Sequence, residues 1–285
     1  IHIMDDWPMI AYRKTVFHLI EYVYMQNFIA WFMRKAVVRM AICPEMVTAY
    51  KTRYQQNFES FQNTIDIAKW SQFRNDADVE NEVTEIIYVG SIYAHAQAES
   101  LVEVCRAIGR LVDDNHKIIL RIYSHGTFVS AYTEQFSAIP GVDIRSELDD
   151  NEEFFRVLAN ASVLLLPVNF DPVSVKNIGL SMPTKIPAML NSGTPILAYG
   201  PVSVAQIQYA VREKWAHVVS DRDINTLAES ILKISNDKVM RKELSANAIK
   251  CAKKYHDAAV VRDAFQTSLA HGSKSKSAFI QRRIK

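Results

Sequence analysis

The segment from Ser181 to Lys185 contains two hydroxyl groups, a proline and an ammonium group, and it lies in the connection that follows a predicted buried strand at 163–167. Pro183 suits the first turn of a helix, and Ser181 suits its cap. Lys185 adds a cation and Thr184 a hydroxyl at a helix start, where free N–H groups and the dipole favour negative charge. The segment is therefore predicted to bind an anion such as a phosphate, although an ordinary connection in a parallel sheet would show the same pattern.

Polar residues also follow three other predicted strands. Asp5 and Asp6 end the strand that begins the chain, where they can line a site or cap the next helix. Gly90 and Ser91 follow the strand at 85–89, and a glycine there lets the backbone approach a ligand closely. Ser124 and His125 follow the strand at 117–123. A single histidine is more often structural than a ligand.

The elements around these residues alternate between strand and helix along the chain. Strands are predicted at 37–42, 85–89, 117–123, 141–144, 163–167, 194–198 and 217–219, and helices at 44–54, 99–111, 149–158, 183–192, 202–212, 224–234, 240–255 and 258–269. Gly193 is expected to end the short helix after Lys185. This alternation predicts a doubly wound parallel sheet of Rossmann type, with ligands at the carboxyl ends of its strands.

Three segments have other patterns. Residues 9–35 are rich in aromatics and methionine and predict a long helix, which either packs between domains or lies on a membrane surface with its basic flanks. Packing is the favoured reading. Residues 55–81 carry many Asn, Gln and Asp and predict an interdomain connector. The basic residues of 272–285 predict a mobile tail, with attraction to anionic lipids as the alternative.

Composition excludes several classes of protein. The 285 residues are 49% hydrophobic and 22% charged, which suits about two domains with real cores. Their 33 basic and 31 acidic residues leave a net charge of +2, so nucleic acid is not expected as a partner. Three widely spaced cysteines fit a reducing compartment and neither a disulfide framework nor a zinc site. No signal peptide and no membrane-spanning run of ~18 residues is recognised.

A block of residues around Lys185 resembles a family signature. It comprises Ser181-x-Pro183-x-Lys185, Leu190, Ser192-Gly193-x-Pro195 and Tyr199-Gly200-Pro201. The block is similar to the donor site of nucleotide-sugar glycosyltransferases with the GT-B fold, in the family 4-like branch. The resemblance covers residues 84–268 and more weakly 1–70, so the N-terminal part of the first domain is expected to be missing. Such a fold pairs two Rossmann-type domains, here a partial one and a donor domain.

The resemblance implies transfer of a sugar from a nucleoside diphosphate-sugar to a saccharide or lipid-linked acceptor, without a metal or other cofactor and with retention of configuration. In the family a glutamate pair holds the sugar and the ribose, and the corresponding positions here are Leu180 and Ala188. Many members also carry cations soon after the first glycine. Residues 92–96 contain none, so that role would pass to Lys185, Lys176 or Arg121.

Site residues follow from this reading. Asp5 and Asp6, on the acceptor side, and Lys185 are expected to be catalytic; a carboxylate there could bind an acceptor hydroxyl or assist its deprotonation. The donor is expected to contact Gly90, Ser91, Ser124, His125, Lys176, Ser181, Pro183, Thr184 and Lys185.

The expected domains are 1–70 for the acceptor side and connector, 71–269 for the donor domain with a C-terminal crossing helix, and 270–285 for the tail. A cytoplasmic enzyme of polysaccharide or cell-surface glycan synthesis, with a peripheral membrane contact, fits this picture. A binding module that does not turn nucleotide sugars over is the main alternative. A Rossmann-type oxidoreductase fits less well, because its glycine fingerprint is absent.

Overall fold

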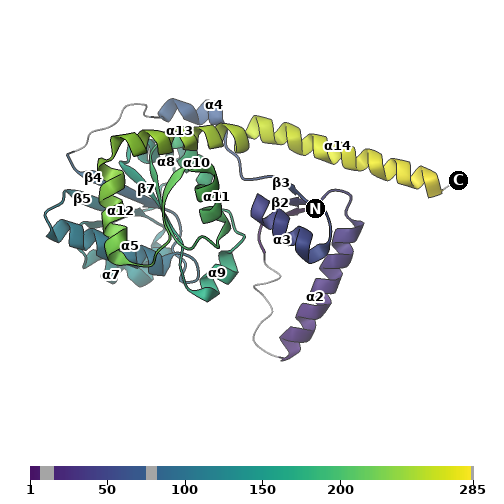
Figure 1. The fold of residues 1–285 in the computed structure, drawn as a ribbon, viewed down its shortest axis with the longest axis horizontal. Helices are drawn as coiled ribbons and strands as arrows, with labels where there is room; N and C mark the ends of the chain where they lie inside the picture. The colour runs from purple at the N-terminus through teal and green to yellow at the C-terminus, as the bar shows by residue number, and fades with distance from the viewer. Residues whose placement is uncertain (7–15, 75–81, 284–285) are drawn as a thin grey trace.

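The computed structural model describes residues 1–6, 16–74 and 82–283, and it contains a larger and a smaller α/β unit (Figure 1). The larger unit is built on a parallel sheet of six strands in the order β6-β5-β4-β7-β8-β9. Its strands are β4 (Thr84–Val89), β5 (Ile118–Tyr123), β6 (Val142–Arg145), β7 (Val163–Pro167), β8 (Ile196–Tyr199) and β9 (Ala216–Val219). The predicted doubly wound sheet is therefore confirmed.

The chain reverses its winding direction between β4 and β7, which are neighbours in the sheet although β5 and β6 lie between them in sequence. Ligands of open α/β sheets bind at such a switch point, outside the carboxyl ends of the strands. The helices of this unit are α5 (Ala98–Asp113), α6 (Gly126–Val129), α7 (Thr133–Ser137), α8 (Asn151–Asn160), α9 (Pro172–Ile178), α10 (Ile186–Ser192), α11 (Ala205–Glu213), α12 (Ile224–Asn236) and α13 (Lys238–Tyr255).

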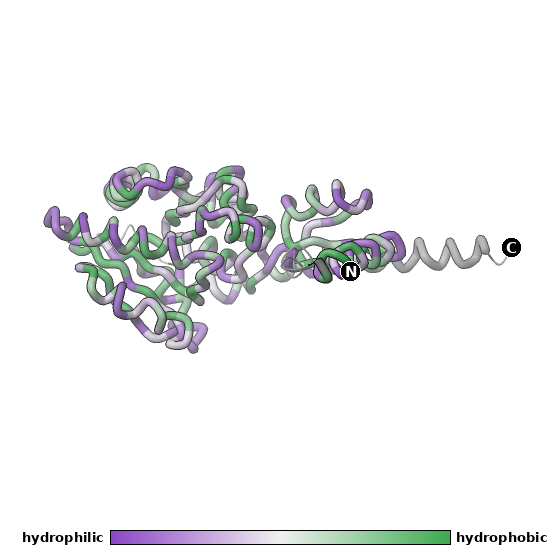
Figure 2. The backbone as a smooth tube through the Cα atoms, turned by 90° about the horizontal axis from the view of Figure 1, so that it is seen from below, coloured by the Kyte–Doolittle hydropathy of each residue, from purple (hydrophilic) through white to green (hydrophobic). Residues whose placement is uncertain are grey.

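Each face of this sheet buries its own apolar core. Ile86, Leu165 and Leu197 point to one face and pack with α5 and α12. Ile87 and Leu166 point to the other face and pack with α8, α10, α11 and α13. Both clusters contain fully buried strand residues, as expected for strands covered on both sides. Figure 2 shows the corresponding green, apolar stretches inside the larger unit and purple stretches at its periphery.

The smaller unit contains a parallel sheet of three short strands, β1 (His2–Ile3), β2 (Met40–Ala41) and β3 (Glu59–Ser60), in that order. The helix α3 (Pro44–Tyr54) has the predicted bounds, with Pro44 in its first turn. Strand β3 was not predicted, because residues 55–81 were expected to form a connector. Its two side chains are both exposed, so no apolar alternation marks the strand.

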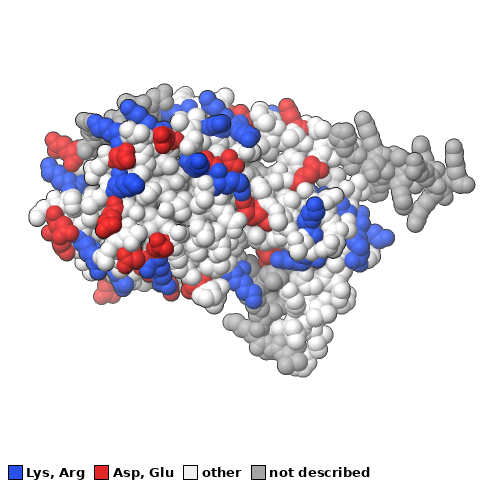
Figure 3. Space-filling model, viewed as in Figure 1, with Lys and Arg blue, Asp and Glu red and all other residues white. Residues whose placement is uncertain are grey.

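The helix α2 (Val16–Lys35) buries little of its apolar surface in the described chain. Ile29 and Met33 are buried. The hydroxyl of Tyr54, the last residue of α3, donates a hydrogen bond of 3.2 Å to Gln26 Oε1 of α2. Eight large apolar side chains of the helix are exposed, including Phe17 at 78% and Tyr24 at 70%. Figure 3 shows this flank as a mainly white surface with few charges. The predicted packing is therefore found on one narrow stripe of the helix, and residues 9–15 lie outside the described chain.

The connector contacts the larger unit at His256, a buried histidine at the end of α13. His256, which has no exposed surface, lies 2.7 Å through Nδ1 from the Asn63 carbonyl oxygen and 2.9 Å through Nε2 from the Tyr209 hydroxyl. A β-bridge links Ile65 with Asp257 beside it. Farther along the connector are α4 (Ile67–Trp70) and η1 (Ser71–Phe73). The Trp70 ring stacks on Phe155 of α8, with centroids 4.2 Å apart and planes 9° from parallel.

The last helix, α14 (Ala258–Arg283), leaves this junction and passes the small sheet (Figure 1). Phe265 contacts the rings of His2 and Phe61 of the smaller unit, at centroid distances of 6.0 and 5.2 Å. The helix runs on through residue 283 and so includes most of the basic segment 272–285, for which a mobile tail was predicted. Among the helices of the described chain, none has the length and apolar content needed to cross a bilayer.

Candidate functional site

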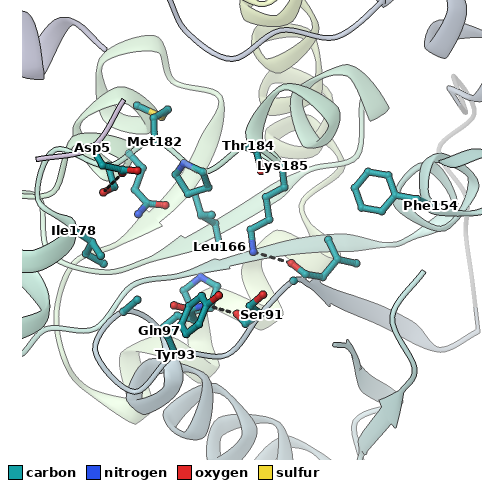
Figure 4. A pocket seen from close by; sticks show the side chains of 17 residues that line it. Asp5, Ser91, Tyr93, Gln97, Phe154, Leu166, Ile178, Met182, Thr184 and Lys185 are labelled. Carbon is teal, nitrogen blue, oxygen red and sulfur yellow. Dashed lines mark hydrogen bonds between the residues drawn. The ribbon is translucent and has the colours of Figure 1, made fainter. Parts of the chain in front are cut away.

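A cavity of about 430 Å³ opens at the switch point, beyond the ends of β4 and β7 (Figure 4). The turn after β4 forms one wall, and the loop at 181–185 forms another. Asp5 reaches the cavity from the smaller unit, and Phe154 and Gln206 line it from α8 and α11. The cavity thus draws on both units and lies where an open parallel sheet places its ligands.

The loop at 181–185 differs from the expected helix start. The helix α10 begins at Ile186, with Lys185 in the N-cap position and Pro187 in the first turn, so Pro183 precedes the helix. Ser181 does not cap it; its hydroxyl donates a hydrogen bond of 3.2 Å to Asp5 Oδ1. The backbone N–H groups of Thr184 and Lys185 make no hydrogen bond within the described chain. Gly193 ends the helix at a φ of 76°, as predicted.

Lys185 is the central cation of the cavity. Its Nζ donates a hydrogen bond of 2.8 Å to the Val89 carbonyl oxygen and lies 4.2 Å from the centre of the Tyr88 ring. Part of the side chain is exposed, but protein atoms surround the ammonium group, and this desolvation lowers the Lys185 pKa to about 7. Within the described residues no carboxylate pairs with it. An anion entering the cavity would supply the missing partner.

The turn after β4 is held in place by a local network. The Tyr88 hydroxyl donates a hydrogen bond of 2.6 Å to the Ser91 carbonyl oxygen, and the Gln97 amide also donates to that oxygen. Gly90 has a φ of 125°, which side-chain-bearing residues rarely adopt. A β-carbon built on Gly90 would lie 3.5 Å from Lys185 Nζ. A glycine therefore leaves room beside the ammonium group.

Asp5 and Asp6 occupy different environments. Asp5 is exposed and lines the cavity. Asp6 is buried in a two-pronged ion pair with Arg53, at 2.6 and 2.9 Å, and accepts a hydrogen bond of 2.8 Å from the Tyr50 hydroxyl. Asp6 is not among the residues lining the cavity. The geometry therefore favours Asp5 for chemistry and gives Asp6 the role of fixing the strand end to α3.

A second cavity of about 160 Å³ adjoins the first and shares Val89, Gly90, Ser91 and Phe154 with it. Ser124 lines it, is 2% exposed and has no hydrogen-bond partner for its hydroxyl in the described chain. His125 lines it too. His125 caps α6, accepting a hydrogen bond from the Thr127 N–H, and its Nε2 lies 3.7 Å from a carboxylate oxygen of Glu147.

Two of the predicted cations lie elsewhere. Lys176 is exposed on α9 and lines neither cavity. Arg121 pairs with Glu85 and Asp143 on the sheet.

Two residues that line the larger cavity, Phe154 and Gln206, were not predicted from the sequence. The signal that could have found them is their place in the first turn of helices that follow strands, as in the segment 181–185. In the described part of the chain, no cluster of three His, Cys, Asp or Glu side chains is arranged to hold a metal ion.

Known structures share this architecture. A glycosyltransferase from Rickettsia africae superposes with a TM-score of 0.64 at 10% identity over 85% of this chain. The α,α-trehalose 6-phosphate synthase of Burkholderia multivorans gives 0.68 at 12% identity over 98%. HepE from Anabaena, solved in complex with UDP-glucose, gives 0.65 at 13% identity over 95%. The chain spans 66%, 66% and 71% of these three proteins, which is about two thirds of their length.

No known family model matches the sequence, and no curated protein matches it either. The structural similarities, at such low identity, show a shared fold. The six-stranded Rossmann-like sheet with a small parallel sheet beside it is the GT-B architecture in partial form.

Proposed function

From this GT-B fold and the geometry of the cavity, we propose that the protein is a glycosyltransferase that uses a nucleoside diphosphate-sugar and a saccharide or lipid-linked acceptor. One observation carries the proposal: the ammonium group of Lys185 stands without a carboxylate partner in a cavity at the switch point of the sheet. A desolvated cation in such a place is suited to a phosphate ligand. The Anabaena protein solved with UDP-glucose has the same fold.

The donor is proposed to lie along the two joined cavities. The nucleoside occupies the smaller cavity near Ser124 and His125, and the diphosphate lies between Gly90 and Lys185. The sugar then points toward Asp5. Lys176 does not take part in this arrangement, because it lines neither cavity.

Transfer breaks the bond between the anomeric carbon and the diphosphate oxygen, and the electron pair leaves with the diphosphate. Lys185 and the free N–H group of Thr184 stabilise the charge that develops there; preorganised donors contribute about 3 kcal/mol each. The acceptor hydroxyl attacks the anomeric carbon on the face from which the diphosphate departs, and its proton passes to the departing diphosphate oxygen; Asp5 is the carboxylate placed to bind that hydroxyl. Retention of configuration is proposed from the family resemblance alone.

The proposal includes a membrane contact for a lipid-linked acceptor. Eight large apolar side chains of α2, from Phe17 to Phe32, are exposed; the helix has a single acidic residue, Glu21, and ends with Arg34 and Lys35. Apolar area together with terminal cations favours an anionic lipid surface. We place synthesis of a cell-surface glycan on the cytoplasmic side of such a membrane.

Binding to UDP and GDP by isothermal titration calorimetry tests the phosphate role. Lys185→Ala should weaken binding at least tenfold, whereas Lys176→Ala, an exposed lysine outside both cavities, should leave it unchanged. Wild-type affinity in Lys185→Ala would refute the role of this residue. Binding of UDP-glucose without hydrolysis or transfer would favour a non-catalytic binding module, and binding of NAD in place of UDP would favour an oxidoreductase.

A further inference from the structure

Gln206 is a buried polar side chain that the proposed reaction has not yet used. It is the second residue of α11, is 4% exposed and lines the larger cavity. Its Oε1 is buried and has no hydrogen-bond partner in the described chain. Buried amides are nearly always hydrogen-bonded, because an unpaired one loses its contacts with water and gains nothing in return.

The position of α11 places Gln206 at one end of the cavity. The Ala205 N–H donates a hydrogen bond of 2.8 Å to the Gly179 carbonyl oxygen, which holds the start of α11 against the loop that leads to Ser181. Ser181 in turn contacts Asp5. The residues shared with the smaller cavity are Val89 to Ser91 and Phe154, so Gln206 is not part of the nucleoside end.

We propose that the side-chain amide of Gln206 binds hydroxyl groups of the transferred sugar, an inference that rests on the glycosyltransferase function proposed above. An amide both donates and accepts hydrogen bonds, so it can pair with two neighbouring hydroxyls of a sugar ring. It carries no charge. Its ligand is therefore a neutral hexose or acetamido sugar, and an acidic sugar would bring a second carboxylate close to Asp5.

A purely structural role explains the residue less well. The neighbouring residues of α11 that build the core are apolar, namely Ala205, Ile207, Tyr209 and Ala210. Gln208, on the exposed side of the same helix, has a partner in the Ser203 carbonyl oxygen. Of these two glutamines, only Gln206 is buried, and its Oε1 has no hydrogen-bond partner in the described chain. Sugar binding supplies partners that the folded protein lacks.

Calorimetry with UDP, UDP-glucose and UDP-N-acetylglucosamine on the whole chain tests the inference. In the wild type, at least one of the two nucleotide sugars should bind more tightly than UDP. Gln206→Met, which keeps the volume and removes the hydrogen bonds, should weaken nucleotide-sugar binding about tenfold and leave UDP binding unchanged. Gln206→Asn should behave in the same way, and it introduces no apolar group. Gln208→Met is the matched control and should bind as the wild type does.

The outcomes separate this inference from the function on which it rests. Equal weakening of UDP and nucleotide sugars by Gln206→Met would overturn the sugar role and leave the donor site in place. Unchanged binding of all three ligands would overturn it as well. Failure of the wild type to bind UDP would instead reject the proposed function and the inference together. The melting temperature of Gln206→Met should equal or exceed that of the wild type; a clear decrease would reveal a structural amide and count against the inference.

Discussion

At the scale of single residues, Lys185 is the only lysine or arginine of the described chain that lines the larger cavity. Its ammonium group is surrounded by protein and contacts a carbonyl oxygen and the Tyr88 ring but no carboxylate. Desolvation lowers its pKa to about 7, so the charged and neutral forms are equally populated near pH 7. A bound diphosphate would favour the charged form and would draw a proton from solution. Lys185 should therefore be mainly protonated when an anion is bound, and it should lose this proton more easily once the anion has left.

This balance predicts a pH-dependent affinity. The free protein loses the Lys185 proton as pH rises through about 7, so binding of UDP should weaken between pH 6.5 and pH 8.5. The decrease should be about tenfold, the change expected when one protonation becomes coupled to binding. Lys185→Met should bind weakly with a flat profile, which separates the lysine from titration of the nucleotide. Titration calorimetry in buffers of different ionisation enthalpy should show proton uptake by the wild type alone.

The two neighbouring aspartates should respond differently to the same substitution. Asp6→Asn breaks the ion pair with Arg53 and should lower the free energy of unfolding by about 2 kcal/mol, because a half-buried guanidinium loses its partner. Asp5→Asn should change the free energy of unfolding by less than about 0.5 kcal/mol, as expected at an exposed position. Urea denaturation measures both. An equal loss in the two variants would contradict the division of roles.

At the scale of elements, agreement between sequence and structure follows the strength of the local pattern. The strands β4, β5 and β7 were predictable because both faces of the sheet are covered, and α3 because Pro44 marks its first turn. The turns that hold Gly90 and Lys185 followed from strand ends. Strand β3 and the start of α10 were missed, because β3 has exposed side chains and α10 has a second proline, Pro187, one turn later than expected. The burial of Gln206 and the ion pair of Asp6 with Arg53 depend on tertiary contacts that residue spacing does not reveal.

The helix α2 allows a test of the proposed membrane contact. Replacing Phe17, Tyr24 and Trp31 together by serine removes large exposed apolar groups without touching Ile29 or Met33. The triple variant should lose most of its co-sedimentation with vesicles of phosphatidylcholine and phosphatidylglycerol and keep its affinity for UDP. Retained sedimentation would exclude the lipid role of α2. A change from an associated to a monomeric state in size-exclusion chromatography, without any vesicle binding, would instead assign this surface to protein contacts.

At the scale of the whole molecule, the junction at His256 ties the connector to the larger unit. Burial lowers the pKa of His256, so at mildly acidic pH this side chain is protonated in the unfolded chain and neutral in the folded chain. The free energy of unfolding should therefore decrease as pH falls below about 6.5, the model-peptide value. His2 and His217, whose pKa values are also lowered by burial, should act in the same direction.

A substitution measures how much His256 contributes to this pH dependence of the free energy of unfolding. His256→Phe keeps an aromatic ring and removes both hydrogen bonds, and it should lower the free energy of unfolding by about 2 kcal/mol at pH 7. Its decrease between pH 7 and pH 5 should be shallower than that of the wild type. Hydrogen exchange should quicken at Ile65, whose N–H donates to the His256 carbonyl oxygen. An unchanged pH slope in denaturation experiments would show that the other histidines carry the whole effect.

The stacked pair of Trp70 and Phe155 has an optical consequence. Phe155 follows Phe154, which lines both cavities, so a ligand that moves α8 also changes the surroundings of the indole. The emission of Trp70 should shift in wavelength or intensity when UDP is added, and Trp70→Phe should abolish that change while binding persists. The molecule thus carries its own fluorophore, separated from the cavity by Phe155 and Phe154, and the occupancy of the cavity can be followed in solution without a label.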